Sequence, residues 1–277
     1  MDVVAFLPPL LLQHLLVVLA PDHTVVPAAS WTEVLRAVRT QPVDVLVLDP
    51  GTDGMVGTAE VVLMMQRFPS VPVVLYVALS PAGMKAVGEL GRHGARQVVL
   101  QRFDDDPIRF RAVLELQQSY VLGDRLLDAI RPGITLLTPL LRAAVERMVR
   151  QPSRFQNADE LAAAARVTYR TLFRHFASAG LASPRSMVVG ARLLRAYSYM
   201  RDPGADLLDV AVKSGYSAPR ILTRNMMEAI GISPARMRRW MESDEFIRRL
   251  AAWMHPAPVD PLRLSTRSTS DDRPPQR

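Results

Sequence analysis

The chain has 277 residues and no cysteine, which excludes a disulfide framework, a thiolate nucleophile and a cysteine metal cluster. Its 49% hydrophobic content is ordinary for a globular protein, and its length allows two domains that each have a core. The net charge of +7 is uneven, because residues 1–137 hold 11 basic and 14 acidic residues whereas residues 138–255 hold 19 and 10. This asymmetry indicates that the back half contacts a polyanion such as a nucleic acid.

The apolar start of the chain, residues 3–20, raises the question of a membrane segment. Pro8 and Pro9 interrupt it, and Gln13 and His14 lie inside it. No basic region precedes it, and no convincing small-residue cleavage site is present. We therefore expect a buried strand and a helix here, in a cytoplasmic protein that has no membrane contact.

The first 118 residues alternate short apolar runs with longer periodic stretches. The continuous run at 43–48 is typical of a strand in a sheet that is covered on both faces. Ser30 and Glu33 have the spacing of a capping box, in which each side chain satisfies a backbone N–H of the other residue. The predicted strands are 3–7, 23–26, 43–48, 71–78 and 97–100, and the predicted helices are 9–19, 30–39, 58–68, 81–91 and 107–118. Five strands alternating with five helices predict an α/β fold with a doubly wound, five-stranded parallel sheet.

This order and size resemble the receiver domain of bacterial response regulators. The resemblance places a phosphorylatable aspartate at the end of the third strand, where this chain has Asp49. It also implies an acidic pair, a Thr or Ser and a lysine, at positions where this chain has Pro8–Pro9, Val77 and Gln101. Phosphoryl transfer depends on charge neutralisation by the metal and the lysine. We therefore expect a pseudo-receiver that works without phosphorylation, with a phosphorylation switch at Asp49 as the alternative.

Residues 119–136 are predicted to be a helical connector. Leu122, Leu126, Leu127 and Ile130 have roughly helical spacing, and the helix breaks at Arg131-Pro132-Gly133. This stretch either extends the last receiver helix and supports a dimer, or packs back on its own domain.

Two later segments share one pattern. Residues 168–176 place Arg170 and Arg174 at i and i+4, and residues 217–226 place Arg220 and Arg224 in the same way. The two arginine pairs lie 50 positions apart. The spacing indicates one helix-turn-helix unit used twice.

These motifs resemble the arabinose-regulator (AraC-type) family of transcription factors, over residues 137–240. The second unit carries the more specific signature, namely Asp209-Val210-Ala211, Gly215-Tyr216-Ser217, Arg224 and Gly231-Ile232-Ser233-Pro234. The chain departs from the family in having Leu222 and Met226 where phenylalanines are usual, and in having Gly180 one place before the usual glycine position. The resemblance implies two helix-turn-helix units joined by a long helix.

The helices expected in this all-α part follow from the apolar spacing and the capping residues. Asn157 and Thr168 are the expected N-caps of the first unit, and Arg166-Val167 is its turn. The expected helices are 137–149, 158–165, 168–176, a long joining helix from Ser183-Pro184 to Asp202-Pro203-Gly204, 207–214, 217–229 and 243–254.

Eight residues are candidate DNA contacts. Geometry and the family pattern assign base contacts to Arg170, Phe173 and Arg174 in the first unit. The corresponding base contacts in the second unit are Arg220, Thr223 and Arg224. Thr168 and Ser217 carry hydroxyls that can contact a phosphate. The alternatives are a solvated helix face for the four arginines and core packing for Phe173. The histidines show no ligand spacing, so we expect no metal and no cofactor.

The sequence predicts a sequence-specific, DNA-binding transcriptional regulator that is not an enzyme, because no catalytic constellation appears. Its expected parts are a pseudo-receiver (1–118), a connector (119–136), an AraC-type DNA-binding domain (137–254) and a disordered tail (255–277). Expected partners are double-stranded DNA and a second copy of the chain. The resemblance adds activation through RNA polymerase in a bacterial cell. An adaptor that does not contact bases is the remaining alternative.

Overall fold

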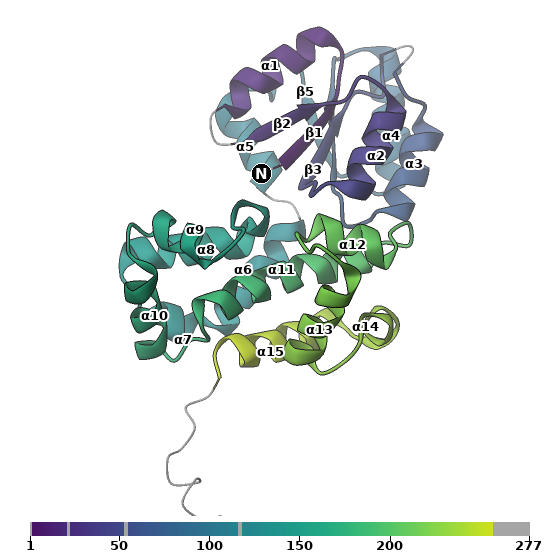
Figure 1. The fold of residues 1–277 in the computed structure, drawn as a ribbon. Coiled ribbons are helices and arrows are strands. Elements are labelled where there is room, and N and C mark those ends of the chain that lie inside the picture. The colour runs from purple at the N-terminus through teal and green to yellow at the C-terminus, as the bar shows by residue number, and fades with distance from the viewer. Residues whose placement is uncertain (1, 21–22, 53–54, 116–117, 257–277) are drawn as a thin grey trace, which may run out of the picture.

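The computed structural model describes residues 2–20, 23–52, 55–115 and 118–256, and of residues 115–120 it describes no side chain. An α/β domain lies above a helical region in Figure 1. The predicted end of the helix at 107–118 falls partly outside the described residues, and the predicted tail does so almost entirely.

The sheet has five parallel strands in the order β2-β1-β3-β4-β5. Their bounds are β1 Asp2–Phe6, β2 Thr24–Pro27, β3 Val45–Leu48, β4 Val73–Val77 and β5 Gln97–Leu100. This is the strand order of flavodoxin-like doubly wound folds. All four residues of β3 are buried, as the continuous apolar run predicts. The expected α/β fold is therefore confirmed.

Helices cover both faces of the sheet (Figure 1). One face is covered by α1 (Pro9–Leu19) and α5 (Pro107–Glu115), and the other by α2 (Trp31–Thr40), α3 (Thr58–Arg67) and α4 (Pro81–Arg92). Ser30 caps α2 by accepting the Glu33 N–H at 3.2 Å. The prediction of a reciprocal bond is wrong, because the Glu33 carboxylate accepts the N–H of Ala29 at 2.8 Å instead of that of Ser30.

The helical region contains the remaining elements. They are α6 Gln118–Ala129, α7 Arg131–Ile134, α8 Pro139–Arg150, the 3-10 turn η1 Pro152–Arg154, α9 Ala158–Ala164, α10 Tyr169–Ser178, α11 Pro184–Met200, α12 Leu207–Lys213, α13 Pro219–Ile230, α14 Pro234–Trp240 and α15 Ser243–Met254. Helix α6 packs against α8 and α15 and buries Leu126 and Leu127. The segment expected as a connector thus packs on the helical region and not back on the sheet.

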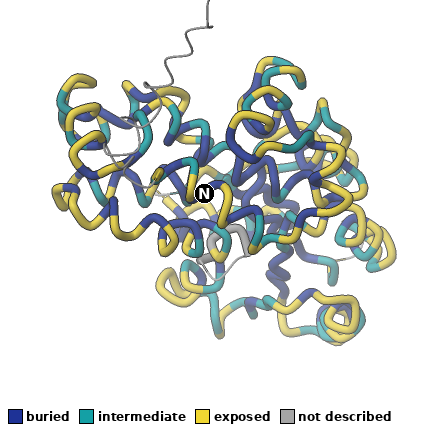
Figure 2. The backbone as a smooth tube through the Cα atoms, turned by 90° about the horizontal axis from the view of Figure 1, so that it is seen from below, coloured by how far each residue is buried: buried dark blue, intermediate teal, exposed yellow. Residues whose placement is uncertain are grey.

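One apolar cluster continues from the α2–α3–α4 side of the sheet into the helical region. Figure 2 shows buried backbone through the middle of both regions and exposed backbone along the periphery. No helix among the described residues is long and apolar enough to cross a membrane.

Candidate nucleic-acid interface

The first helix-turn-helix unit consists of α9 and α10. Asn157 caps α9 by accepting the Glu160 N–H at 2.9 Å, and Thr168 caps α10 by accepting the Thr171 N–H at 3.2 Å. Both caps are the expected ones. Between the two helices the chain turns through Arg166, whose φ of +54° lies in the left-handed region.

Helix α10 divides into a buried and an exposed side. Leu172 and Phe176 are fully buried, while Arg170 and Arg174 are exposed. Phe173 is 50% exposed, so its ring does not fill the core of this chain. Tyr169 is exposed beside Arg170. Tyr169 is not among the predicted contact residues, although its place at the first position of the helix was available as a signal.

The second unit consists of α12 and α13. Helix α12 begins with a capping box, in which the Asp209 N–H donates to Asp206 at 2.7 Å and the Asp206 N–H donates to Asp209 at 3.4 Å. The turn passes through Gly215, at φ +76°, where the first unit has Arg166. Helix α13 ends at Gly231, which has a φ of +83°.

Helix α13 presents the same arrangement as α10. Arg220 and Arg224 are exposed, Thr223 is half-buried, and Leu222 and Met226 are fully buried. The exchange of the family's phenylalanines for Leu222 and Met226 therefore keeps these positions in the core.

The start of α13 differs from the expectation. The helix begins at Pro219, two residues after the expected Ser217, and Ala218 is its N-cap without a side-chain hydrogen bond. Ser217 is exposed ahead of the helix. Pro219 fixes φ at the first helical position, so the helix starts there and not at the Ser217 hydroxyl. Its N-cap, Ala218, has no side-chain oxygen to accept an N–H.

Helix α11 joins the two units. Gly180 follows α10 with a φ of +67°, so the left-handed residue stands at Gly180 and not at Leu181. The Ser183 hydroxyl caps α11 by accepting the Ser186 N–H at 3.1 Å. Figure 1 shows α10 and α13 on opposite sides of the helical region, with α11 between them.

A cleft of about 850 Å³ lies between the two units. Its walls include Tyr169 from α10, Arg224 from α13, and Arg185 and Arg192 from α11, together with acidic residues such as Asp159. Arg185 and Arg192 are not among the predicted contact residues, because neither belongs to the duplicated pattern. The cleft connects the two exposed helix faces through a wall that carries further arginines.

Asp49 lies at the opposite end of the molecule, at the carboxyl end of β3. Asp49 is 2% exposed, and its carboxylate accepts the Gly51 N–H at 2.8 Å and the Thr52 hydroxyl at 2.6 Å. The loop packs tightly on α4, since a Cβ on Gly51 would lie 2.6 Å from the Gly83 Cα. Asp49 is therefore engaged by its own loop.

The sheet domain contacts the second unit through the amino ends of its strands and the loops that precede them. The Ser70 N–H and hydroxyl donate to the Asp202 carboxylate at 2.8 and 2.5 Å, and the Gly204 N–H donates to the Arg67 carbonyl at 2.8 Å. Burial raises the pKa of Asp202, and the Ser70 hydrogen bonds oppose that shift. These contacts fix the loop between α11 and α12 on the sheet domain.

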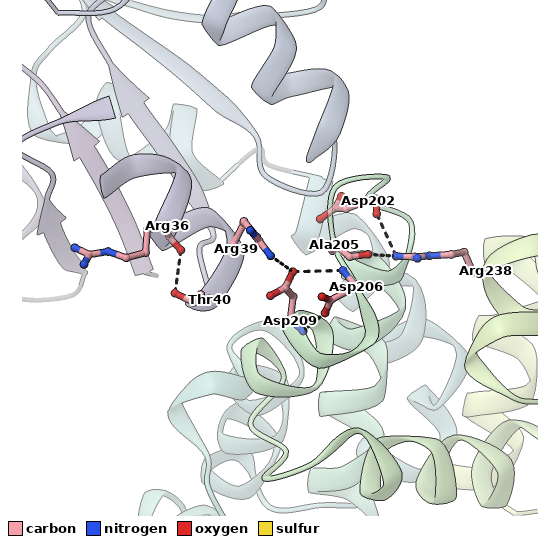
Figure 3. Close-up of polar contacts among 8 residues, drawn as sticks. All are labelled: Arg36, Arg39, Thr40, Asp202, Ala205, Asp206, Asp209 and Arg238. Carbon is pink, nitrogen blue, oxygen red and sulfur yellow. Dashed lines mark hydrogen bonds and ion pairs between the residues drawn. The ribbon is translucent and has the colours of Figure 1, made fainter. Parts of the chain in front are cut away.

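Two ion pairs add to this contact. Arg39 of α2 pairs with Asp209 of α12 at 3.3 Å, as Figure 3 shows. Arg195 of α11 pairs with Asp44, and both side chains are buried. Nothing in the sequence analysis pointed to either pair, because their members are 170 and 151 positions apart.

Comparisons with known proteins agree with the helical part. Residues 161–240 match a family model described as a helix-turn-helix domain, the AraC-type domain that the motifs predicted. The match covers less than a third of the chain. It assigns residues 161–240 to a helix-turn-helix domain, and such a domain indicates a DNA-binding regulator. No curated protein matches the chain in sequence.

A crystal structure of full-length FixJ from B. japonicum is similar to this chain with 15% identity and a TM-score of 0.34, over 84% of this chain and 98% of that one. Among the described residues, no group of His, Asp or Glu side chains is placed to hold a metal ion.

Proposed function

We propose that the chain is a sequence-specific transcriptional regulator whose two helix-turn-helix units each insert their second helix into the major groove of DNA. The observation that carries the proposal is the duplicated face, in which Arg170 and Arg174 on α10 correspond to Arg220 and Arg224 on α13. All four arginines are exposed and each pair is backed by fully buried apolar residues.

The chemistry of these faces suits base contact. A guanidinium can donate two parallel hydrogen bonds to the O6 and N7 of guanine, and each good pair contributes about 1–3 kcal/mol of discrimination. Phe173 is placed beside the arginines to contact a thymine methyl group, and Thr223 occupies the corresponding place on α13. Thr168 and Ser217 precede the two helices, where hydroxyls meet phosphates.

We further propose that the sheet domain works without phosphorylation. Asp49 is buried and its oxygens accept hydrogen bonds from its own loop, and Pro8, Pro9 and Gln101 stand where a metal pair and a lysine are needed. Incubation with acetyl phosphate and Mg²⁺ is expected to leave the protein unlabelled. Labelling that disappears in Asp49→Asn would establish the phosphorylation-switched alternative instead.

A second copy of the chain and RNA polymerase are proposed partners, in the bacterial cytoplasm. A single chain with two units reads one long asymmetric site, and a dimer reads two. Sedimentation of the full-length chain tests the dimer directly.

The test of base contact is genome-wide crosslinking and sequencing in the source organism. The wild type should yield one asymmetric motif that disappears in Arg174→Ala plus Arg224→Ala. The matched control is Arg36→Ala plus Arg92→Ala, which removes two exposed arginines from the sheet domain and should leave the motif unchanged. A motif that survives in the first variant, or no motif in any protein, favours the adaptor alternative.

A further inference from the structure

Helix α1 of the sheet domain is apolar on its exposed face as well as on its buried one. The residues that it buries in the core of the sheet domain are Leu11, Leu15, Val18 and Leu19. On the other side Leu10 is 66% exposed and Val17 is 77% exposed, and Leu16 is exposed beside them. Figure 1 shows α1 at the outside of the sheet domain, on the far side from the helical region. A helix that is apolar all round is normally covered, so this face has the character of a contact surface.

The exposed face of α1 also lacks charge. The helix contains no Asp, Glu, Lys or Arg, and its polar side chains are Gln13 and His14. The helices α2, α3, α4 and α5 each expose at least one charged residue, namely Arg36, Glu60, Lys85 and Arg109 in that order. Exposed apolar patches of this kind commonly mark interaction sites. Among the described helices of the sheet domain, α1 is the one least suited to face water.

The two polar side chains of α1 have different places. The His14 Nδ1 lies 2.8 Å from the Tyr76 hydroxyl and 3.7 Å from a carboxylate oxygen of Asp105, so the ring is engaged by the sheet domain itself. Gln13 is exposed. At 3.6 residues per turn it lies on the exposed face between Leu16 on one side and Val17 on the other, near the middle of the helix. The face therefore has an uncharged amide at its centre and apolar side chains around it.

We propose that the exposed face of α1 is the surface on which a second copy of the chain docks, with the two α1 helices antiparallel across a two-fold axis near Gln13. The inference rests on the second copy named in the proposed function and gives it a place. In a two-fold interface the same patch of both copies meets, so a charged group near the axis would face its own copy. An uncharged patch avoids that repulsion.

The polar group at the centre suits this symmetry. The amide of Gln13 carries both a donor and an acceptor, so it can exchange hydrogen bonds with the Gln13 amide of the second copy. Antiparallel packing then places Leu10, one turn before Gln13, against Leu16 and Val17 of the second copy, one turn after it. Ile108 is exposed on α5, which packs beside α1, and it extends the apolar surface.

The charges next to the face favour a second copy over a membrane. A helix that lies on an anionic membrane normally carries Lys or Arg on its polar face, and α1 has neither. The loop before α5, which reaches His14 through Asp105, carries the acidic run Asp104-Asp105-Asp106. Negative lipid headgroups would be repelled by this run.

Cross-linking tests the geometry, because the chain has no cysteine and each introduced thiol is therefore unique. A disulfide needs Cα atoms about 4.4–6.8 Å apart. Full-length Gln13→Cys should form a disulfide-linked dimer on mild oxidation. The matched control is Leu63→Cys on α3, which is 56% exposed and should remain monomeric on a non-reducing gel. Leu10→Cys mixed with a tagged Val17→Cys should form the mixed disulfide more readily than either variant links to itself.

Sedimentation of uncross-linked protein tests the affinity. Val17→Asp should raise the dimer dissociation constant at least tenfold, and Leu63→Asp should dimerise as the wild type does. The inference is overturned if the wild type is a monomer, or if Gln13→Cys and Leu63→Cys cross-link equally. A monomer that co-sediments with lipid vesicles through Leu10 and Val17 would overturn it in favour of a membrane surface. A dimer that persists in Val17→Asp would reject this surface and keep the proposed second copy, and none of these outcomes bears on base contact.

Discussion

The two helix-turn-helix units are alike on the side that faces outward and different on the side that faces the rest of the chain. Both expose an arginine pair over fully buried apolar residues. In the first unit α9 packs against the helices α8, α10 and α11. In the second unit α12 also packs against α2 of the sheet domain, and Asp209 pairs with Arg39. A repeated unit thus keeps its exposed arginine face while its supporting helix has a different neighbour.

That difference indicates how the sheet domain is coupled to the helical region. The amino ends of the strands hold α11 and α12, whereas Asp49 lies at the carboxyl end of β3. We therefore expect a change in the sheet domain to act on α11 and α12, which these contacts hold.

Breaking the buried pair between Asp44 and Arg195 should have the largest effect. In Asp44→Ala the Arg195 guanidinium loses its carboxylate, and we expect the free energy of unfolding to fall by about 3–5 kcal/mol, measured in urea. Hydrogen exchange should increase more in α12 than in α9. The control is Asp128→Ala, which breaks an exposed pair with Arg131 and should cost less than about 1 kcal/mol. An equal, small loss in both variants would contradict the proposed coupling.

The pH dependence of stability tests the buried lysine at the same joint. Since burial lowers the pKa of Lys213 to about 8 from an ordinary 10.5, the unfolded chain binds more protons between these pH values. The free energy of unfolding should therefore rise with pH in this window, by about 3 kcal/mol across the whole of it. The charged groups that face Lys213 are Asp202, Arg195 and Asp209.

Lys213→Met should remove this rise, measured by urea unfolding between pH 7.5 and 9.5 in buffers without phosphate or carboxylate. Burial also raises the pKa of Tyr76, Tyr199 and Tyr216, and these groups are present in both proteins, so the difference between wild type and variant reports Lys213. A variant with the same slope as the wild type would show that Lys213 keeps its ordinary pKa.

The two turns offer a smaller comparison. Gly215→Ala places a Cβ on a residue at φ +76° and should destabilise the chain by about 1 kcal/mol. Arg166→Gly at φ +54° relieves the same strain in the first unit. We expect it to be neutral or stabilising by a few tenths of a kcal/mol, because the greater freedom of glycine in the unfolded chain offsets part of the gain. Thermal melts measure the change in stability of each variant. A Gly215→Ala variant that is more stable than the wild type would contradict the left-handed conformation at Gly215.

Much of the fold was predictable because local rules determine it. The apolar runs gave the five strands, and side-chain oxygens gave the caps at Asn157 and Thr168. The start of α13 was expected at Ser217, whereas Pro219 sets the actual boundary. The alternation of the arginine pairs with buried apolar residues likewise predicted the exposed faces of α10 and α13.

The joint between the regions was not predictable from the sequence. Asp44 and Arg195 are separated by 151 positions, and each alone resembles an ordinary surface charge. Lys213 belongs to a short helix, and its burial depends on Tyr199 and on the docking of the sheet domain. Such groups become informative only when tertiary packing removes them from water.

The central claim is that both units contact bases, and selection of DNA sequences from a random pool by the purified full-length chain tests it most directly. The wild type should select a motif with two conserved blocks. Arg170→Ala plus Arg174→Ala should erase one block, and Arg220→Ala plus Arg224→Ala should erase the other. If either double variant selected the complete wild-type motif, the corresponding unit would not read DNA and the account would be contradicted.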